Sequence, residues 1–433
     1  MHASDLLLLV LALVVLAWVL MSARLGQLSI TAPMAFVAAG TLIALLPGEP
    51  VEISPTSGSV RLLVEYALVF VLFCDASRVS LTWLRDQAQI PGRLLLLGLP
   101  LTIAAGIGIA WLLFPSGDPW IAAVIGAALA PTDAALGSSV MTDKRVPQLI
   151  RRVLNVESGL NDGIVTPFVL FFIAAALATV DQTDVASALA TAGVELIGGV
   201  VLGMALGWAG ARLISASRQH RWMDPTVADL AAFPLPVIAY AGAVEIGVNG
   251  FVAAFVSGLA FGNTMRSTQD DPLTFAEDGG SLLSLVVWFL FGAVAVPNLV
   301  NDLTWQVALY ALLSLTVVRM VPVLLVLIGS GVSRKDDWVI AWLGPRGLAS
   351  VVFALLALDA LGGKGSPGGL VVEVVGVTVL LSIVLHGVTA APIARSYART
   401  APAGEAPEMP VRRGVPVSAW LRSGDSKRPS GAG

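Results

Sequence analysis

The segment "AAVIGAALAPTDAALGSSVM", residues 122–141, places Pro131, Thr132 and Asp133 in the middle of an apolar run. A run of about 20 residues is long enough to cross a bilayer as a helix. Proline removes a backbone donor and clashes with the preceding turn, so we expect the helix to be interrupted there. The backbone groups freed by the interruption need partners in a cavity lined by protein or water, because lipid offers none.

A second apolar run, "VIAWLGPRGLASVVFALL" at residues 339–356, carries Pro345 and Arg346 between two glycines. A pair of broken apolar segments, one in each half of the chain, is typical of transporters whose site lies on an inverted repeat. Ordinary proline kinks are the alternative reading. Each break also holds a charged residue at membrane depth, where a charge is costly, and this favours an ion or substrate site at the two breaks.

The composition excludes a soluble domain for most of the chain. Of 433 residues, 56% are hydrophobic and 12% are charged, and the mean hydropathy is +0.85. These values indicate an all-α polytopic membrane protein. The single cysteine, Cys74, excludes an internal disulfide framework. The first apolar run lacks a basic leader, so we interpret it as a membrane span rather than a signal peptide.

Apolar segments divide the chain into about thirteen predicted membrane spans. Their ranges are 5–21, 27–46, 59–76, 93–114, 119–141, 157–180, 186–215, 226–246, 250–263, 280–299, 303–330, 336–358 and 370–394. Together they form a predicted membrane domain at residues 1–398.

Basic residues gather in alternate loops, and this pattern predicts the orientation of the chain. With the amino terminus outside, the outward loops carry only Arg61 and Lys364, and the other basic loop residues face inward. The carboxyl terminus is then cytoplasmic, and the plasma membrane is the expected location. Residues 399–433, rich in Pro, Gly, Ser and Ala, predict a disordered cytoplasmic tail. Contact of its basic residues with anionic lipid is the alternative to a plain soluble tail.

A group of polar residues opens the sixth predicted span, "NVESGLNDGIVTPFVLFF" at 155–172. On a helix, Glu157 and Asn161 lie four residues apart, as do Ser158 and Asp162, so the four side chains form adjacent stripes on one face. A solvated helix start would also tolerate these residues. Their position beside the broken helices favours a buried site.

Oxygen atoms are the ligands that a hard cation requires in exchange for its water shell. Asp162, Ser158 and Thr132 provide such oxygens, and we predict that they bind a monovalent cation. The three histidines are scattered and offer no softer metal site. Burial disfavours an ionised carboxylate, so Asp162 can hold a proton or a cation in turn. A site with this property would exchange the two across a membrane.

The buried charge of Arg346 needs a partner, and we predict an ion pair with Glu157 that leaves Asp162 free to titrate. Three further acidic residues lie near span ends: Asp75, Asp229 and Glu373. We interpret these as side chains that reach the membrane interface.

Several motifs together resemble one known family. They are "PTDAAL" (131–136), "ESGLNDG" (157–163), "YAGAVEIGVNGFVAAFVSGLAFGN" (240–263), "VVRMVPV" (317–323), "GPRGLASVVFAL" (344–355) and "SIVLHGVTAAP" (382–392). In order and spacing they resemble the sodium/proton exchanger family of monovalent cation:proton antiporters, in its prokaryotic NhaP-like branch. The resemblance implies a thirteen-helix inverted-repeat fold with two crossed discontinuous helices. It also implies a core and a dimerisation subdomain, a homodimer, and an elevator movement.

The resemblance also assigns roles to the candidate residues. Asp162 would carry the ion or the proton, with Ser158 and Thr132 as further ligands of Na⁺. Four residues would support this site: Glu157, held by Arg346, and Asp133 and Asn161, which would stabilise the crossed helices. Asn161 stands where electrogenic members have a second aspartate, which implies electroneutral exchange of one cation for one proton. Ala134 departs from a proline that is frequent in the family, and Asn249 departs from a frequent serine; the first change bears on ion selectivity.

The expected function is therefore antiport of a monovalent cation, Na⁺ first and K⁺ or Li⁺ as alternatives, against H⁺. No enzymatic activity, resident cofactor or nucleic-acid partner is expected, and membrane lipid surrounds the protein. A cation channel or uniporter is the main competing hypothesis. An intramembrane hydrolase that uses Glu157 and Asp162 as an acid/base pair is a weaker one, because the sequence has neither a metal cluster nor a nucleophile elbow.

Overall fold

The computed structural model describes residues 3–45, 57–86, 89–115, 118–265 and 272–398. Within these ranges every regular element is a helix, which confirms the predicted all-α class. The predicted tail, residues 399–433, lies outside the described residues.

The helices of the first half are α1 (Ala3–Gln27), α2 (Ala32–Ala44), α3 (Gly58–Arg78), α4 (Leu81–Asp86), α5 (Gln89–Arg93), η1 (Leu94–Gly98), α6 (Leu99–Leu113), α7 (Pro119–Ala128), α8 (Ser138–Met141) and α9 (Gln148–Val180). They continue with α10 (Val185–Gln219), η2 (Pro225–Leu230), α11 (Pro234–Glu245), α12 (Gly250–Met265), α13 (Thr274–Leu290), η3 (Phe291–Ala295) and α14 (Val296–Asn301). The last are α15 (Trp305–Leu313), η4 (Ser314–Val318), α16 (Arg319–Leu327), α17 (Arg334–Trp342), α18 (Leu348–Leu361) and α19 (Pro367–Ala398).

Each of the predicted spans coincides with helical structure, and the protein is a multi-pass membrane protein. Eight helical stretches of the described chain are long and apolar enough to cross a membrane, and the apolar helices α2, α7, α12 and α18 are shorter. The helix α3 is long enough but carries Arg61, Glu65, Asp75 and Arg78. The number of thirteen crossings stays a prediction.

Both predicted interruptions are present, and they cross. The helix α7 ends at Ala128 and α8 begins at Ser138, while α17 ends at Trp342 and α18 begins at Leu348. The backbone N–H of Asp133, in the first break, donates to the carbonyl of Pro345, in the second, at 2.7 Å. The two non-helical segments therefore provide partners for one another's freed backbone groups, as the prediction of crossed discontinuous helices requires.

Three helical stretches each contain one π turn, which the sequence did not predict: η1, η3 and η4. A π turn disturbs the regular i→i−4 ladder and often lies at a functional site. The carbonyl of Gly292 in η3 accepts a hydrogen bond from the Thr41 hydroxyl of α2 at 3.1 Å. The carbonyl of Ser314 in η4 accepts from Arg346 Nη2 at 3.3 Å. Two of the π turns thus supply acceptors to neighbouring segments.

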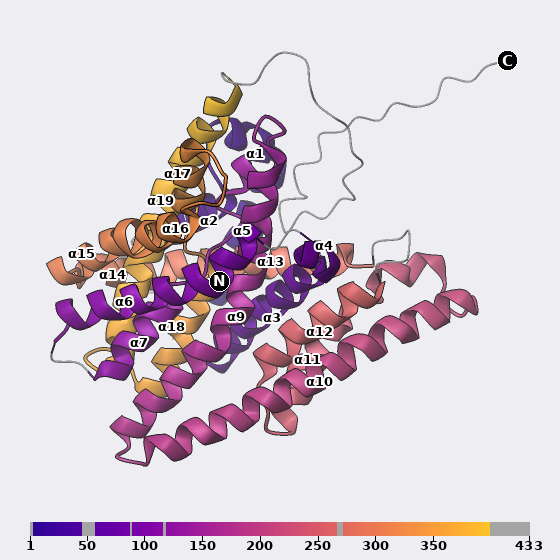
Figure 1. The fold of residues 1–433 in the computed structure, drawn as a ribbon, viewed down its shortest axis with the longest axis horizontal. Helices are drawn as coiled ribbons and strands as arrows, with labels where there is room; N and C mark the ends of the chain where they lie inside the picture. The colour runs from indigo at the N-terminus through magenta and orange to yellow at the C-terminus, as the bar shows by residue number, and fades with distance from the viewer. Residues whose placement is uncertain (1–2, 46–56, 87–88, 116–117, 266–271, 399–433) are drawn as a thin grey trace.

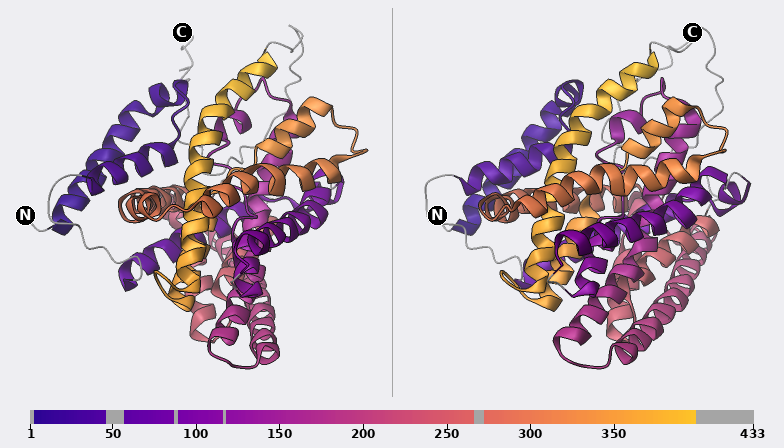
Figure 2. Two further views of the ribbon diagram at one scale, coloured as in Figure 1. Left: turned by 90° about the vertical axis from the view of Figure 1, so that its left-hand side faces the viewer. Right: turned by 60° about the vertical axis from the view of Figure 1, so that its left-hand side comes forward.

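Small residues let several helices approach closely. A side chain at Gly203 or Gly207 of α10 would overlap the backbone of Ala253 or Ser257 of α12. Figure 1 shows α10, α11 and α12 together on one side of the bundle, with α15, α17 and α19 on the other. In Figure 2 the amino-terminal helices (indigo) lie to one side of α19 (yellow), and α2 and α19 are in contact.

Candidate functional site

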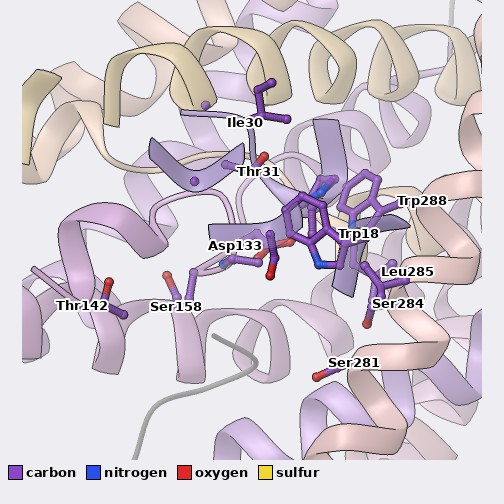
Figure 3. Close-up of a pocket in the computed structure, with 18 of the residues that line it drawn as sticks. Trp18, Ile30, Thr31, Asp133, Thr142, Ser158, Ser281, Ser284, Leu285 and Trp288 are labelled. Atoms are coloured by element: carbon purple, nitrogen blue, oxygen red, sulfur yellow. The ribbon is translucent and has the colours of Figure 1, made fainter. Parts of the chain in front are cut away.

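A cavity of about 460 Å³ lies where the first interruption, α9 and α13 meet. Figure 3 shows Asp133 near its centre, with Ser158 on one side and the rings of Trp18 and Trp288 on the other. The polar residues that line the cavity include Asp75, Thr132, Asp133, Thr142, Asp143, Ser158, Asp162, Ser281 and Ser284. The cavity is largely apolar, and its acidic residues come from α3, the first interruption, α9 and the loop between α8 and α9.

The helix α9 positions Ser158 and Asp162 four residues apart on the face that lines the cavity. Two glycines let this helix approach its neighbours. A side chain at Gly163 would overlap the ring of Phe255 on α12, and Gly159 lies against the backbone of Asp75 on α3. The close packing fixes the polar face of α9 at the cavity rather than in lipid.

Asp162 is 9% exposed, and its buried Oδ1 atom has no hydrogen-bond partner among the described residues. The hydroxyls of Ser158 and Thr132 lie 3.3 Å apart, and both residues line the same cavity as Asp162. A carboxylate oxygen without a donor and two hydroxyl oxygens on one cavity fit the ligand preference of a hard cation. The donor set therefore suits an ion that is bound and released as cargo.

Asn161 connects α9 to the first interruption. Its Nδ2 atom donates to Thr132 Oγ1 at 2.6 Å, and its Oδ1 atom has no partner in the part of the chain that the structure describes. Because Thr132 Oγ1 accepts this bond, its own proton is available to Ser158 Oγ. Asn161, which is 1% exposed, thus holds the Thr132 side chain in place.

Asp133 caps the amino-terminal end of α18. Its Oδ2 atom accepts from the N–H of Leu348 at 3.2 Å, and its Oδ1 atom accepts from the N–H of Ala135 at 2.7 Å. A carboxylate is favourable at this end of a helix because the free N–H groups carry partial positive charge. Gly347 makes the contact possible, since a Cβ there would overlap the Asp133 carboxylate.

Arg346 has the complementary position at the end of α7. Its Nη1 atom donates to the carbonyls of Ala130 and Pro131 at 2.7 and 3.2 Å, just beyond the last residue of α7. With the carbonyl of Ser314, the fully buried guanidinium therefore has three carbonyl acceptors. A positive charge is favourable at a helix carboxyl end.

The predicted ion pair between Arg346 and Glu157 is wrong. The partner of Glu157 is Arg319, with Nη1 and Oε1 2.6 Å apart, and the described residues show no ion pair between Glu157 and Arg346. The physical reason is that the interruption and η4 leave carbonyls that attract Arg346, so another cation must neutralise Glu157. Arg319 directly follows the π turn of η4, and its side chain passes over Gly344.

Asp75 is a cavity residue that the sequence analysis missed. Its place near the end of a span predicts a side chain that reaches the membrane interface, but Asp75 lines the same cavity as Asp133 and Asp162. It lies one turn before the end of α3, next to Gly159 of α9. Its signal in the sequence was an acid in an apolar helix, without the breaker that identified the other sites.

A fourth acid, Asp143, stands in the loop between α8 and α9 at the edge of the cavity. It forms an ion pair with Arg145, with Nη2 and Oδ2 2.6 Å apart. The hydrogen bond from Arg145 holds the pKa of the Asp143 carboxyl below its usual range. Asp143 therefore stays ionised near neutral pH and adds negative potential at the edge of the cavity.

The predicted site residues thus fall into two groups. Thr132, Asp133, Ser158 and Asp162 line the cavity. Glu157, Asn161 and Arg346 are buried and each contact an element that supports it: Arg319, Thr132 and the end of α7, respectively. Among the described residues, no group of three or more His, Cys, Asp or Glu is arranged to hold a metal ion.

Two crossed interrupted helices beside buried carboxylates, in a multi-helix membrane bundle, define an ion-coupled secondary transporter. A family model for the transmembrane sodium/hydrogen exchanger matches residues 9–396. The chain therefore belongs to the sodium/hydrogen exchanger family, whose NhaP-like branch contains monovalent cation:proton antiporters.

Individual relatives and structures agree with this family. The K(+)/H(+) antiporter NhaP of Alkalimonas amylolytica is 28% identical over 411 residues, which are 92% of this chain and 68% of the relative. The K(+)/H(+) antiporter NhaP2 of Shewanella sp. (strain ANA-3) is 25% identical over 390 residues, which are 89% of this chain and 66% of the relative. The chain thus spans about two thirds of the length of these curated relatives.

The fold is shared with a solved antiporter structure. The sodium proton antiporter MjNhaP1 from Methanocaldococcus jannaschii at pH 8 superposes with a TM-score of 0.73. The sequence identity is 20%, and the match covers 92% of this chain and 99% of that chain. The superposition confirms the predicted antiporter fold.

Proposed function

We propose that the chain exchanges a monovalent cation for protons across the plasma membrane, with Asp162 as the group that carries either one. The observation that carries the proposal is that Asp162, whose Oδ1 atom has no hydrogen-bond partner among the described residues, lines the same cavity as Ser158 and Thr132. A carboxylate in such a place binds a proton or a cation and cannot hold both. Exchange follows if the site moves only when it is loaded.

Sodium is the proposed principal ion, with potassium and lithium as alternatives. The names of the similar proteins include both potassium and sodium, since the curated relatives are K(+)/H(+) antiporters and the solved structure is a sodium proton antiporter. Hydroxyl and carboxylate oxygens bind all three ions, so the test must compare them. The ion is a substrate, and the proposal includes neither a resident cofactor nor an enzymatic step.

The proposed exchange is electroneutral. Asp133 accepts from the N–H of Leu348 at the end of α18 and from the N–H of Ala135, and Glu157 is neutralised by Arg319. The neighbour of Asp162 in sequence is the uncharged Asn161. Asp162 is then the one group that exchanges a bound cation for a bound proton, in a ratio of one to one.

We propose an elevator movement in which α9 and the two interrupted helices move together past α3 and α12. Gly159 and Gly163 of α9 give this interface small residues at which the helices can slide. Spin labels at Leu149 of α9 and Leu62 of α3, both exposed, should change their separation between low pH and high sodium. An unchanged distance under both conditions would argue against the movement.

A homodimer in the lipid bilayer, with the amino terminus outside and the carboxyl terminus in the cytoplasm, completes the proposal. The alternation of basic and non-basic loops supports the orientation. Cross-linking in membranes tests the dimer, and protease protection of tags at the two termini tests the orientation. A monomer, or tags cleaved on the opposite faces, would overturn these parts alone.

The decisive experiment uses proteoliposomes with an acidic lumen and a fluorescent pH probe. Sodium, potassium and lithium are added separately, and an exchanger alkalinises the lumen because each entering cation expels a proton. The variant Asp162→Asn provides the matched control. A channel or uniporter would move the cation without collapsing a proton gradient, and a chain that leaves the lumenal pH unchanged with all three ions is not this exchanger.

A further inference from the structure

A cluster of charged residues joins three helices at the end of α3 that lies away from the cavity. Arg61 Nε lies 2.7 Å from Glu65 Oε1, and Arg61 Nη1 also pairs with Asp359 of α18. Tyr240 of α11 donates to Glu65 Oε2 at 2.8 Å. Arg61 precedes the cavity residue Asp75 by 14 positions on α3, a rise of about 21 Å in a helix. The cluster and the cavity therefore lie near opposite ends of one helix.

One side of the cluster is rigidly held. Glu65 is 4% exposed, and both of its oxygens have partners. The ring of Tyr240 lies edge-on to Tyr66, with centroids 5.4 Å apart, and 5.1 Å from Phe251 of α12. The contact of Arg61 with Glu65 is thus internal to α3 and is supported by α11 and α12.

The other side belongs to the helix that leads from the ion site. Asp359 lies on α18, whose first residue, Leu348, donates its N–H to Asp133. The 11 positions between Leu348 and Asp359 correspond to about 16 Å of helix. Any displacement of the crossed helices relative to α3 is therefore transmitted along α18 to the Asp359 carboxylate.

Beneath the ion pair the helices leave little space. The space lined by Arg61, Glu65, Val352, Leu355, Leu356 and Asp359 measures about 10 Å³, against about 460 Å³ for the cavity. A space of this size is at the lower limit for one water molecule, so it excludes a hydrated cation. The wide cavity that Asp162 lines and the narrow space beneath the ion pair thus lie toward opposite ends of α3.

We propose that the Arg61–Asp359 ion pair is a latch that stabilises this conformation and breaks each time the ion site turns to the opposite end. The proposal rests on the exchange function given above, because only a transporter needs to alternate. The Arg61–Glu65 pair lies within one helix and survives the movement. It holds the guanidinium in place so that the latch can form again.

Thiol labelling tests the latch independently of transport. In a Cys74→Ala background in nanodiscs, Ser284→Cys reports on the cavity and Leu356→Cys reports on the narrow space beneath the ion pair. Adding Asp359→Asn should slow labelling at position 284 and accelerate it at position 356. An exposed ion pair contributes up to about 1 kcal/mol, so the change should reach up to about fivefold. Asp302→Asn, which removes the exposed pair with Lys364, is the matched control.

The outcomes separate the latch from the exchange function. The latch is overturned if Asp359→Asn and Asp302→Asn show equal labelling rates at positions 284 and 356, even if the chain exchanges cations. Shifted rates in a chain that exchanges no cation would support the latch and refute the proposed exchange. If Asp359→Asn does not fold, Arg61→Cys/Asp359→Cys joined by a bifunctional thiol reagent replaces it: reversible loss of exchange supports the latch, and unchanged exchange excludes it.

Discussion

Arg319 Nη1 lies 2.6 Å from Glu157 Oε1, and both side chains are almost completely buried. The pair joins the start of α16 to α9, one residue before Ser158. It neutralises Glu157 and so leaves Asp162 as the uncompensated acid on the same helix. The π turn of η4 precedes Arg319 and also supplies a carbonyl to Arg346. One irregular turn therefore supports both buried arginines.

Removal of Arg319 should destabilise the protein strongly. The variant Arg319→Met leaves the Glu157 carboxylate unpaired in the membrane interior, and breaking a buried pair costs about 3–5 kcal/mol. We expect a lower melting temperature and a lower yield of monodisperse protein after extraction in detergent. Fluorescence-detected size exclusion after a heating series measures both quantities.

The double variant Arg319→Met/Glu157→Gln is the control for this prediction. It removes both charges, so it should recover a substantial part of the lost stability, because replacement of a whole buried pair is often nearly neutral. A double variant as unstable as Arg319→Met would show that Arg319 acts through contacts other than Glu157.

Asp162→Asn should abolish cation-dependent proton movement while the protein still folds. The amide keeps the size of the side chain but can neither ionise nor release a proton at the site. Proteoliposome assays with a lumenal pH probe measure the loss, and size exclusion verifies folding. Asp143→Asn, at the edge of the same cavity, should retain most of the exchange, since its carboxylate pairs with Arg145. Exchange by Asp162→Asn at the unmodified rate would remove this residue from the site.

Gly347→Ala should impair the crossing of the interrupted helices. A Cβ at this position overlaps the Asp133 carboxylate, so Asp133 must leave its cap on α18 or the backbone must shift. Overpacking of this kind costs about 1–3 kcal/mol, and exchange should fall together with thermal stability. Gly108→Ala, whose added methyl would meet no atom within 4 Å, is the matched control. Equal behaviour of the two variants would mean that Asp133 can move without consequence.

The fold could be predicted from the sequence because lipid allows few solutions. Apolar length gives the spans, and a proline next to a charge marks both interruptions near Pro131 and Pro345. The π turns could not be predicted, since segments such as Ser314–Val318 carry no breaker and read as continuous helix. Their position depends on the tertiary partners that donate hydrogen bonds to the displaced carbonyls.

The sequence predicts which residues form the site, but not every contact between them. The spacing of Ser158 and Asp162 predicts that they share one helical face, and in the structure both residues line one cavity. The choice between Arg319 and Arg346 as the partner of Glu157 depends on which buried arginine has free carbonyls nearby. Asp75 was missed for a similar reason, because a sequence does not show which helix face meets α9.

The electrical balance of exchange gives the last prediction. Glu157 is paired with Arg319, Asp133 accepts from backbone N–H groups, and Asn161 adds no charge, so we expect Asp162 to be the acid that carries the ion. One cation should then move against one proton, and the initial rate of lumenal alkalinisation should not change with membrane potential. The measurement compares proteoliposomes at zero and at a large potassium diffusion potential set with valinomycin, with sodium as the exchanged ion. Protein-free vesicles under the same potentials control for proton leak. A rate that rises severalfold when the potential favours net charge movement would require a second titrating acid, for which Asp75 and Asp133 on the same cavity are the candidates.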